Sequence, residues 1–140
     1  MDQMRKFFMR NIKGTLMRED NELVYFEVKN KELVKFDVIN DDIKLYPYHF
    51  TIRPMNAVII DQFFKDRVIE FGCMQLKEYL DYLNLKYYDY EEIVKRNNGW
   101  NMVDLWWVKF DGIGAKNWKE VQTQKYPIYS EGVLEDYLNS

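Results

Sequence analysis

Cysteine and histidine are almost absent from this sequence, with Cys73 and His49 the single example of each. One cysteine excludes an intrachain disulfide, which is typical of proteins in a reducing compartment. One cysteine and one histidine also exclude a Cys/His zinc cluster, and a Ser-His-Asp arrangement would depend wholly on His49. A packing or capping role is the ordinary one for both residues. We therefore expect no metal site, no cofactor and no catalytic role for either.

Long apolar runs and a dominant charge are missing as well. No run approaches the length that spans a membrane, so no transmembrane helix is expected, and the charged stretch 1–10 does not resemble a secretory signal. The 20 Lys and Arg residues are balanced by 23 Asp and Glu residues, a net charge of -3, with the signs alternating along the chain. Because nucleic-acid binding needs a basic field, this pattern disfavours nucleic acid as a partner. We expect a cytoplasmic protein with no membrane association.

Apolar and aromatic residues are abundant, at 47% and 17% of the 140 residues, which is ample for the core of one domain. In the first third they alternate over 22–29 and 32–39, which predicts two strands, and the turn Glu19-Asp20-Asn21 predicts a third strand at 14–18 in an antiparallel meander. Asn30-Lys31 is expected to be a two-residue turn, because Asn tolerates positive φ. The residues expected on one common face of the last two strands are Val24, Phe26, Val28, Val34, Phe36 and Val38.

Helical spacing begins at Pro54 and continues to residue 97. A helix starting near Pro54 is expected to bury Phe63, Phe64 and Arg67 on one face, and further helices are expected at 73–84 and 90–97. Asp89 with Glu92 resembles a capping box at the start of the last one.

Three other segments complete the expected architecture. Pro47 indicates an edge strand or an extended linker over 43–53. Residues 106–110 favour a strand, and 131–140 favour a short helix. The whole predicts one α+β domain, 1–140, that is mainly β over 1–53, mainly α over 54–98 and mixed over 99–140.

The stretch from Gly99 to Phe110 is the most unusual one, because it contains three of the four tryptophans. Such rings either join two layers of structure or grip another protein. Trp106 and Trp107, adjacent on a strand, should point to opposite sides, one into the core and one outward. The candidate partner contacts are Trp100, Trp106, Trp107, Trp118, Tyr87 and Tyr88.

No convincing catalytic motif is present. The glycine loop Asp111 to Lys116 lacks the P-loop spacing and has Asn117 where a Ser or Thr should follow the lysine. Adjacent acids such as Asp41-Asp42 and Glu91-Glu92 suit turns and helix starts rather than two carboxyls facing each other across a cleft. We therefore expect a protein that is not an enzyme.

The middle of the chain resembles the N-terminal region of HipA-like proteins in Firmicutes, over roughly residues 14 to 121. The resemblance rests on Phe64-Lys65-Asp66-Arg67-Val68-Ile69, a Leu-rich helix, a short helix after Asp89, and Gly99-x-Asn101-x-x-Asp104-x-Trp106-Trp107-Val108. The family has "W-L-K-x-R-x-I-P" and "G-L-S-L-x-D-x-Y-W" at these places. Here Phe63-Phe64 replaces Trp-Leu, Glu70 replaces Pro, and Asn101 replaces Ser.

The resemblance implies a docking module without the kinase core that follows this region in HipA-like kinases. Small antitoxins in split HipA-like systems are built in this way and hold a separate kinase inactive. The expected function is thus a non-catalytic protein-protein interaction module that inhibits or regulates a partner enzyme. Two alternatives remain: a phage-encoded, anti-CRISPR-like inhibitor of a bacterial defence enzyme, acting in the host cytoplasm, and a nucleic-acid-binding accessory protein.

Overall fold

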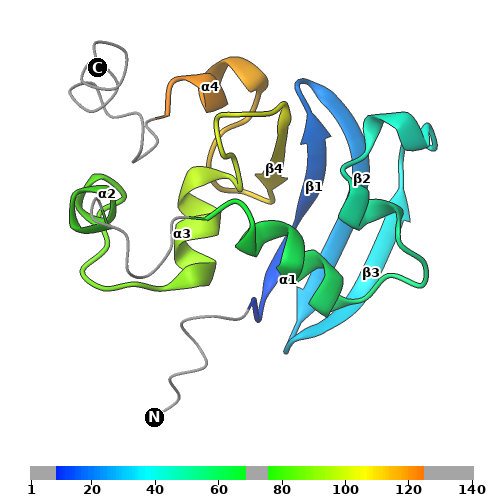
Figure 1. Cartoon of the computed structure of the whole chain (residues 1–140), viewed down its shortest axis with the longest axis horizontal. Coiled ribbons are helices and arrows are strands. Elements are labelled where there is room, and N and C mark those ends of the chain that lie inside the picture. Colours follow the sequence, from blue (N-terminus) through cyan, green and yellow to red (C-terminus); the bar gives the residue numbers. More distant parts are fainter. Residues whose placement is uncertain (1–8, 69–75, 125–140) are drawn as a thin grey trace.

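A four-stranded antiparallel sheet with helices packed on it forms the centre of the molecule (Figure 1). The computed structural model describes residues 9–68 and 76–124. The strands are β1 (Ile12–Arg18), β2 (Asn21–Lys29), β3 (Glu32–Val38) and β4 (Trp106–Phe110). The helices are α1 (Ala57–Lys65), α2 (Leu76–Tyr82), α3 (Tyr90–Asn97) and α4 (Trp118–Gln122), with short 3-10 helices η2 (Ile43–Leu45) and η3 (Tyr48–Thr51). The predicted α+β class is confirmed.

The predicted meander is confirmed, and the predicted strand at 106–110 joins it. The strand order is β3-β2-β1-β4, so the chain returns after three helices to place β4 beside β1. In that pairing Met17 lies opposite Trp107. The turn at Asn30-Lys31 has positive φ at both residues, 53° and 68°, the backbone that a tight hairpin of this hand requires.

The predicted inward face of β3 is wrong at Val34. Val28 pairs with Leu33 and Glu27 with Lys35, so Val34 is the extra residue of a β-bulge. Leu33 packs against the core in its place, and Val34 is left 53% exposed. A bulge depends on how two strands match, and alternation within one strand does not encode it.

Both faces of the sheet are covered near β1 and β4. On one face Leu16 and Val108 lie side by side and belong to the main core with α1 and α3 residues such as Phe64 and Ile93. On the opposite face a second cluster contains four buried residues, which are Met17, Trp100, Trp107 and Val121. Val121 belongs to α4, which the weak pattern after residue 110 did not predict.

The helix predicted to start near Pro54 starts later. Asn56 is its N-cap, and the side-chain oxygen of Asn56 accepts a hydrogen bond from the Ile59 amide at 2.9 Å. The first amides of a helix lack partners within the helix. The Asn56 side-chain oxygen can accept a hydrogen bond from one of them and Pro54 has no such oxygen, which explains the later start. The edge strand or linker predicted for 43–53 is also wrong, because this segment forms η2 and η3.

Helices α2 and α3 follow the prediction. Asp89 caps α3 by accepting from the Glu92 amide at 3.2 Å, and Asn98 ends it with φ of 59°. α2 lies within the predicted 73–84, whereas Cys73 and the helix predicted at 131–140 lie outside the described residues. No helix over 9–68 and 76–124 has the length and apolar content needed to cross a membrane.

Candidate functional site

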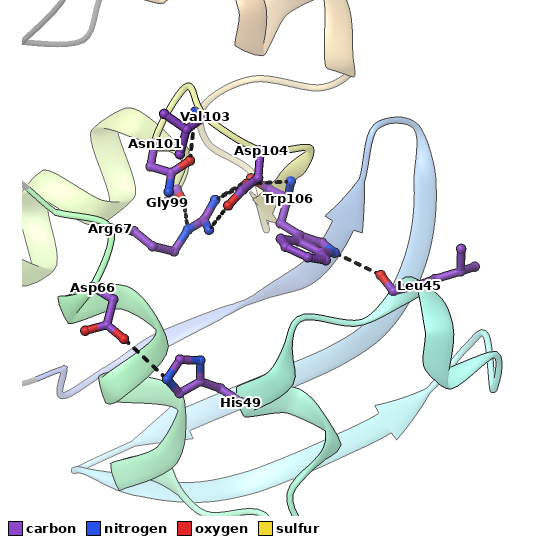
Figure 2. A network of polar contacts seen from close by, with 9 residues as sticks. All are labelled: Leu45, His49, Asp66, Arg67, Gly99, Asn101, Val103, Asp104 and Trp106. Atoms are coloured by element: carbon purple, nitrogen blue, oxygen red, sulfur yellow. Dashed lines mark hydrogen bonds and ion pairs between the residues drawn. The ribbon is translucent and has the colours of Figure 1, made fainter.

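The buried guanidinium of Arg67 holds the loop that leads into β4. Its Nη1 and Nη2 atoms donate to the two carboxylate oxygens of Asp104 at 2.7 and 2.8 Å. Its Nε atom donates to the Gly99 carbonyl and its Nη2 atom to the Trp106 carbonyl, each at 2.8 Å (Figure 2). The loop is therefore held at its start, middle and end by one side chain.

Arg67 can be buried because its whole charge is matched. The Arg67 side chain is 5% exposed and the Asp104 side chain 25%, and the guanidinium lies 4.6 Å from the ring centre of Phe63. Bidentate pairing with a carboxylate and contact with an aromatic face are the geometries that suit arginine. The Asp104 carboxylate also accepts from the Trp106 amide at 3.0 Å. The network positions the backbone, and every atom named in it already has a partner.

The fixed loop shows apolar side chains to solvent. Met102, Val103 and Leu105 are 40%, 70% and 36% exposed. The loop is ordered by its own bonds, since Asn101 accepts from the Val103 amide at 3.2 Å and the Leu105 carbonyl accepts from the Glu19 amide at 2.9 Å. Apolar side chains gathered on a tied loop differ from single exposed ones, which need no explanation.

Three of the six predicted contact residues are buried, which corrects the expectation for them. Trp107, Trp100 and Tyr88 are 0%, 6% and 8% exposed. Their rings fill the two clusters between sheet and helices, so they do not present a surface to a partner. Of the others, Tyr87 is 67% exposed; its contact role stays a prediction.

Trp106 and Trp118 are half-buried. Trp106 packs against the main core, and its indole N–H donates to the Leu45 carbonyl at 2.8 Å (Figure 2). Trp118 meets the Trp100 ring edge-on at 6.4 Å between ring centres. The prediction that the Trp106 and Trp107 rings point to opposite sides of β4 is confirmed. Trp106 packs against the main core, and Trp107 belongs to the second cluster. The sequence did not reveal that both sides of β4 would be covered, because the cover on one side comes from α4.

The indole N–H groups of Trp107 and Trp100 differ in their hydrogen bonding. The Trp107 indole N–H donates to the Glu19 carbonyl at 2.7 Å. The Trp100 indole nitrogen is buried and has no hydrogen-bond partner among the residues that the structure describes. An unmatched buried donor costs free energy, so Trp100 contributes apolar packing at a penalty that Trp107 avoids.

Sequence reasoning missed the roles of Arg67, Asp104 and the apolar loop residues. A signal was present: Arg67 continues the helical spacing of Phe63 and Phe64 just past the end of α1, and a buried arginine requires an acidic partner. Which acid supplies the partner depends on a contact between positions 37 residues apart, which spacing cannot identify.

His49 and Asp61, two titratable groups among the described residues, both make structural contacts. His49 lies 3.4 Å from Asp66, which is mostly exposed (Figure 2), and its ring packs against Phe63. Burial raises the pKa of Asp61 above its ordinary value of 3.8, but this carboxylate accepts from the Met9 amide at 3.1 Å and so anchors the chain before β1. The part of the chain that the structure describes contains no cluster of His, Cys, Asp and Glu suited to a metal ion.

The glycine loop after β4 is a turn. Gly112 and Gly114 both have φ of 75°, and the Asn98 side chain accepts from the Ala115 amide at 3.2 Å. The Lys116 amide donates to the Glu120 side chain, so these contacts of the loop are with neighbouring parts of the same chain.

A hollow of about 290 Å³ lies beside this turn, where β1 begins and β2 ends. Lys13, Lys29 and Lys95 line it together with the acids Glu27 and Asp111. The mixture of signs resembles the mixed charge of the whole chain and makes no basic groove for a nucleic-acid backbone.

Comparisons with models of protein families, with curated proteins and with solved structures find no match for this chain.

Proposed function

We propose that this chain is a protein-binding module that regulates a partner enzyme and has no catalysis of its own. It docks through a surface that we call the loop surface, formed by Met102, Val103 and Leu105 with the half-buried Trp106 beside them. The observation that carries the proposal is the combination of exposed apolar side chains with a backbone held by the buried Arg67.

A fixed loop is well suited to binding. Ordering a flexible loop on association costs free energy, and a loop that is already ordered avoids this cost. Arg67 and Asp104 hold the backbone from within, and their bonds leave the side chains of Val103 and Leu105 free to enter a partner's pocket. Trp106 supports the loop from within, because its ring packs against the main core and its indole N–H donates to the Leu45 carbonyl.

The resemblance of the chain to the N-terminal region of HipA-like proteins identifies the partner that we favour, a separate HipA-like kinase. In that role the chain is an antitoxin or regulator that holds the kinase inactive. The mechanism requires only tight docking, and it agrees with a polar network whose named atoms are all engaged within the fold.

The experiment compares two exposed valines. Val103, on the loop surface, is 70% exposed, and Val58, at the start of α1, is 67% exposed. We expect Val103→Asp to weaken binding to a purified HipA-like kinase by about 30-fold, equivalent to about 2 kcal/mol, and to relieve inhibition of the kinase. Val58→Asp should bind and inhibit like the wild type. Calorimetry gives the affinities, and kinase turnover gives the inhibition.

Other outcomes separate the alternatives. Equal binding by both variants would show that the loop surface is not the docking site. Failure to bind the kinase, together with Val103-dependent binding and inhibition of a CRISPR nuclease, would favour the phage-encoded inhibitor. Salt-dependent binding to bare DNA or RNA, unchanged by Val103→Asp, would favour the nucleic-acid accessory protein.

A further inference from the structure

Within the part of the chain that the structure describes, the outer edge of β3 is open. The Ile39 amide donates to the Leu23 carbonyl of β2 at 2.9 Å, and Val24 and Phe26 pair with Val38 and Phe36. In an antiparallel ladder, residues alternate between pairs that exchange backbone hydrogen bonds and pairs that do not. The N–H and C=O groups of Phe36 and Val38 therefore point away from β2, toward the side on which the sheet has no further strand.

Exposed apolar side chains lie in β3 and just after it. Val34, Val38 and Ile39 are 53%, 48% and 51% exposed. The charges of the strand are confined to Glu32, near its start, and to the pair Lys35 and Asp37. Free backbone groups beside exposed valine and isoleucine make a template for another strand.

The pattern of β3 is complementary to itself. If a second copy of β3 runs antiparallel with the two Phe36 residues opposite each other, Lys35 lies opposite Asp37 of the second copy. The bulge at Val34 interrupts the regular alternation, so the matched segment is 35–37. The pairs within this segment are aromatic with aromatic and positive with negative, combinations that stabilise neighbouring strands.

The neighbouring registers are worse. The outward backbone groups belong to every second residue. The two strands can therefore shift relative to each other only in steps of two residues, which moves the centre of the pairing by one residue in each copy. One slip puts Lys35 opposite Lys35 of the second copy, and the other puts Asp37 opposite Asp37 of the second copy. Like charges directly opposite each other are destabilising, so charge selects the register centred on Phe36.

We propose that β3 is a homodimer interface at which two copies of this chain pair edge to edge, joining two four-stranded sheets into one continuous sheet. The interface uses β3, which lies at the other end of the sheet from β4 and the loop that precedes it (Figure 1). The proposal is thus independent of the proposed regulation of a partner enzyme, and either can fail alone.

The test uses charge reversal and sedimentation over a range of concentrations. We expect the wild-type chain to dimerise, and Lys35→Glu or Asp37→Lys alone to weaken dimerisation on the order of tenfold or more, since each places two pairs of like charges across the interface. An equimolar mixture of the two variants should associate again, because opposite charges then face each other. Lys44→Glu, an exposed lysine beyond β3, changes the net charge equally and should leave dimerisation unchanged.

The mixing experiment distinguishes charge contacts between two copies from the Lys35–Asp37 ion pair within one copy. Lys35 and Asp37 are 3.6 Å apart in the same copy, with side chains 53% and 60% exposed, and neither single variant regains that pair on mixing. Recovery in the mixture must therefore come from contacts between copies. A wild-type chain that stays monomeric up to about 1 mM, singles that dimerise like the wild type, or a mixture that does not recover would each overturn the proposal.

Discussion

The two edge strands of the sheet, β4 and β3, differ in whether their outward backbone groups are hydrogen-bonded. On β4 the Val108 amide donates to the Asn98 carbonyl at 2.8 Å, and the Asn98 side-chain amide donates back to the Val108 carbonyl at 3.0 Å. The Arg67 guanidinium donates a hydrogen bond to the Trp106 carbonyl at the start of the same strand. On β3 the outward groups of Phe36 and Val38 have no such partner among the described residues. One edge is closed by the chain itself, and the other keeps outward backbone groups that no described residue pairs.

The difference shows how one small sheet can serve two purposes. A closed edge holds its strand and the adjoining loop in one position, which suits a loop that must be ready to dock. An open edge keeps backbone hydrogen bonds available to another strand, at the risk of unwanted pairing that the charges on β3 restrict to one register. If this interpretation is right, side chains that serve β4 should matter far more to stability than similar side chains near β3.

The largest effect is expected from the two arginines that lie near the two edges. Arg67→Met leaves Asp104 partly buried without its counter-charge, which should cost about 3–5 kcal/mol of unfolding free energy. Arg53 lies 5.2 Å from the Phe36 ring of β3 and is exposed, so Arg53→Met should cost less than about 1 kcal/mol. Urea denaturation measures both, and equal costs would contradict the contrast between the edges.

The next effect compares two asparagines with positive φ. Asn98 (φ 59°) is 1% exposed and bonds Val108 and Ala115, whereas Asn30 (φ 53°) is exposed in the β2–β3 turn. Glycine accepts this backbone at no steric cost, so Asn98→Gly isolates the lost side-chain bonds, at about 2–3 kcal/mol. Asn30→Gly should stay within about 0.5 kcal/mol. Similar losses at both sites would mean that backbone conformation, rather than edge closure, is the role of Asn98.

A smaller effect is expected inside the second cluster. Trp107→Phe leaves the Glu19 carbonyl without its indole donor, whereas Trp100→Phe removes a donor that has no partner. Both lose similar apolar area, so the Trp107 variant should be less stable by about 1–2 kcal/mol. Thermal unfolding of the two single variants checks this difference, and the reverse order would show that Trp100 makes the more valuable contact.

The smallest effect concerns a tie between β2 and the end of β4. The Tyr25 hydroxyl donates to the Asp111 carboxylate at 2.6 Å, which raises the pKa of Tyr25 from 10.0 to about 12. Because the folded pKa lies above the unfolded one, the stability from this group is present below pH 10 and is lost as pH rises toward 12.

Asp111→Asn should return the pKa of Tyr25 toward 10.0 and flatten the alkaline loss of stability. Absorbance titration of tyrosinate, with Tyr25→Phe to identify the signal, measures the shift. An unchanged Tyr25 titration in the Asp111 variant would show that the hydrogen bond is absent in solution.

Local patterns predicted most of the elements but few of the contacts that make the candidate site. Alternation located β2 and β3, the turn after residue 18 located β1, and Asp89 located the start of α3, because these signals involve residues close in sequence. Such signals could not find the bulge at Val34 or the partner of Arg67, since each depends on pairing between distant segments. The tryptophan-rich stretch was identified as special, but its buried members could not be told from its exposed neighbours.

The sequence by itself determined a meander whose turns suit Asn30 and its neighbours, amphipathic helices, and a charge balance without a basic field. These properties follow from backbone preferences and side-chain period, which act within a few residues. Only the tertiary structure decided that Trp107 is core, that Met102, Val103 and Leu105 face solvent, and that one edge of the sheet is closed. The reason is physical: burial and edge closure are properties of pairs of segments, and the partner segment for β4 is supplied by parts of the chain that no local pattern connects to it.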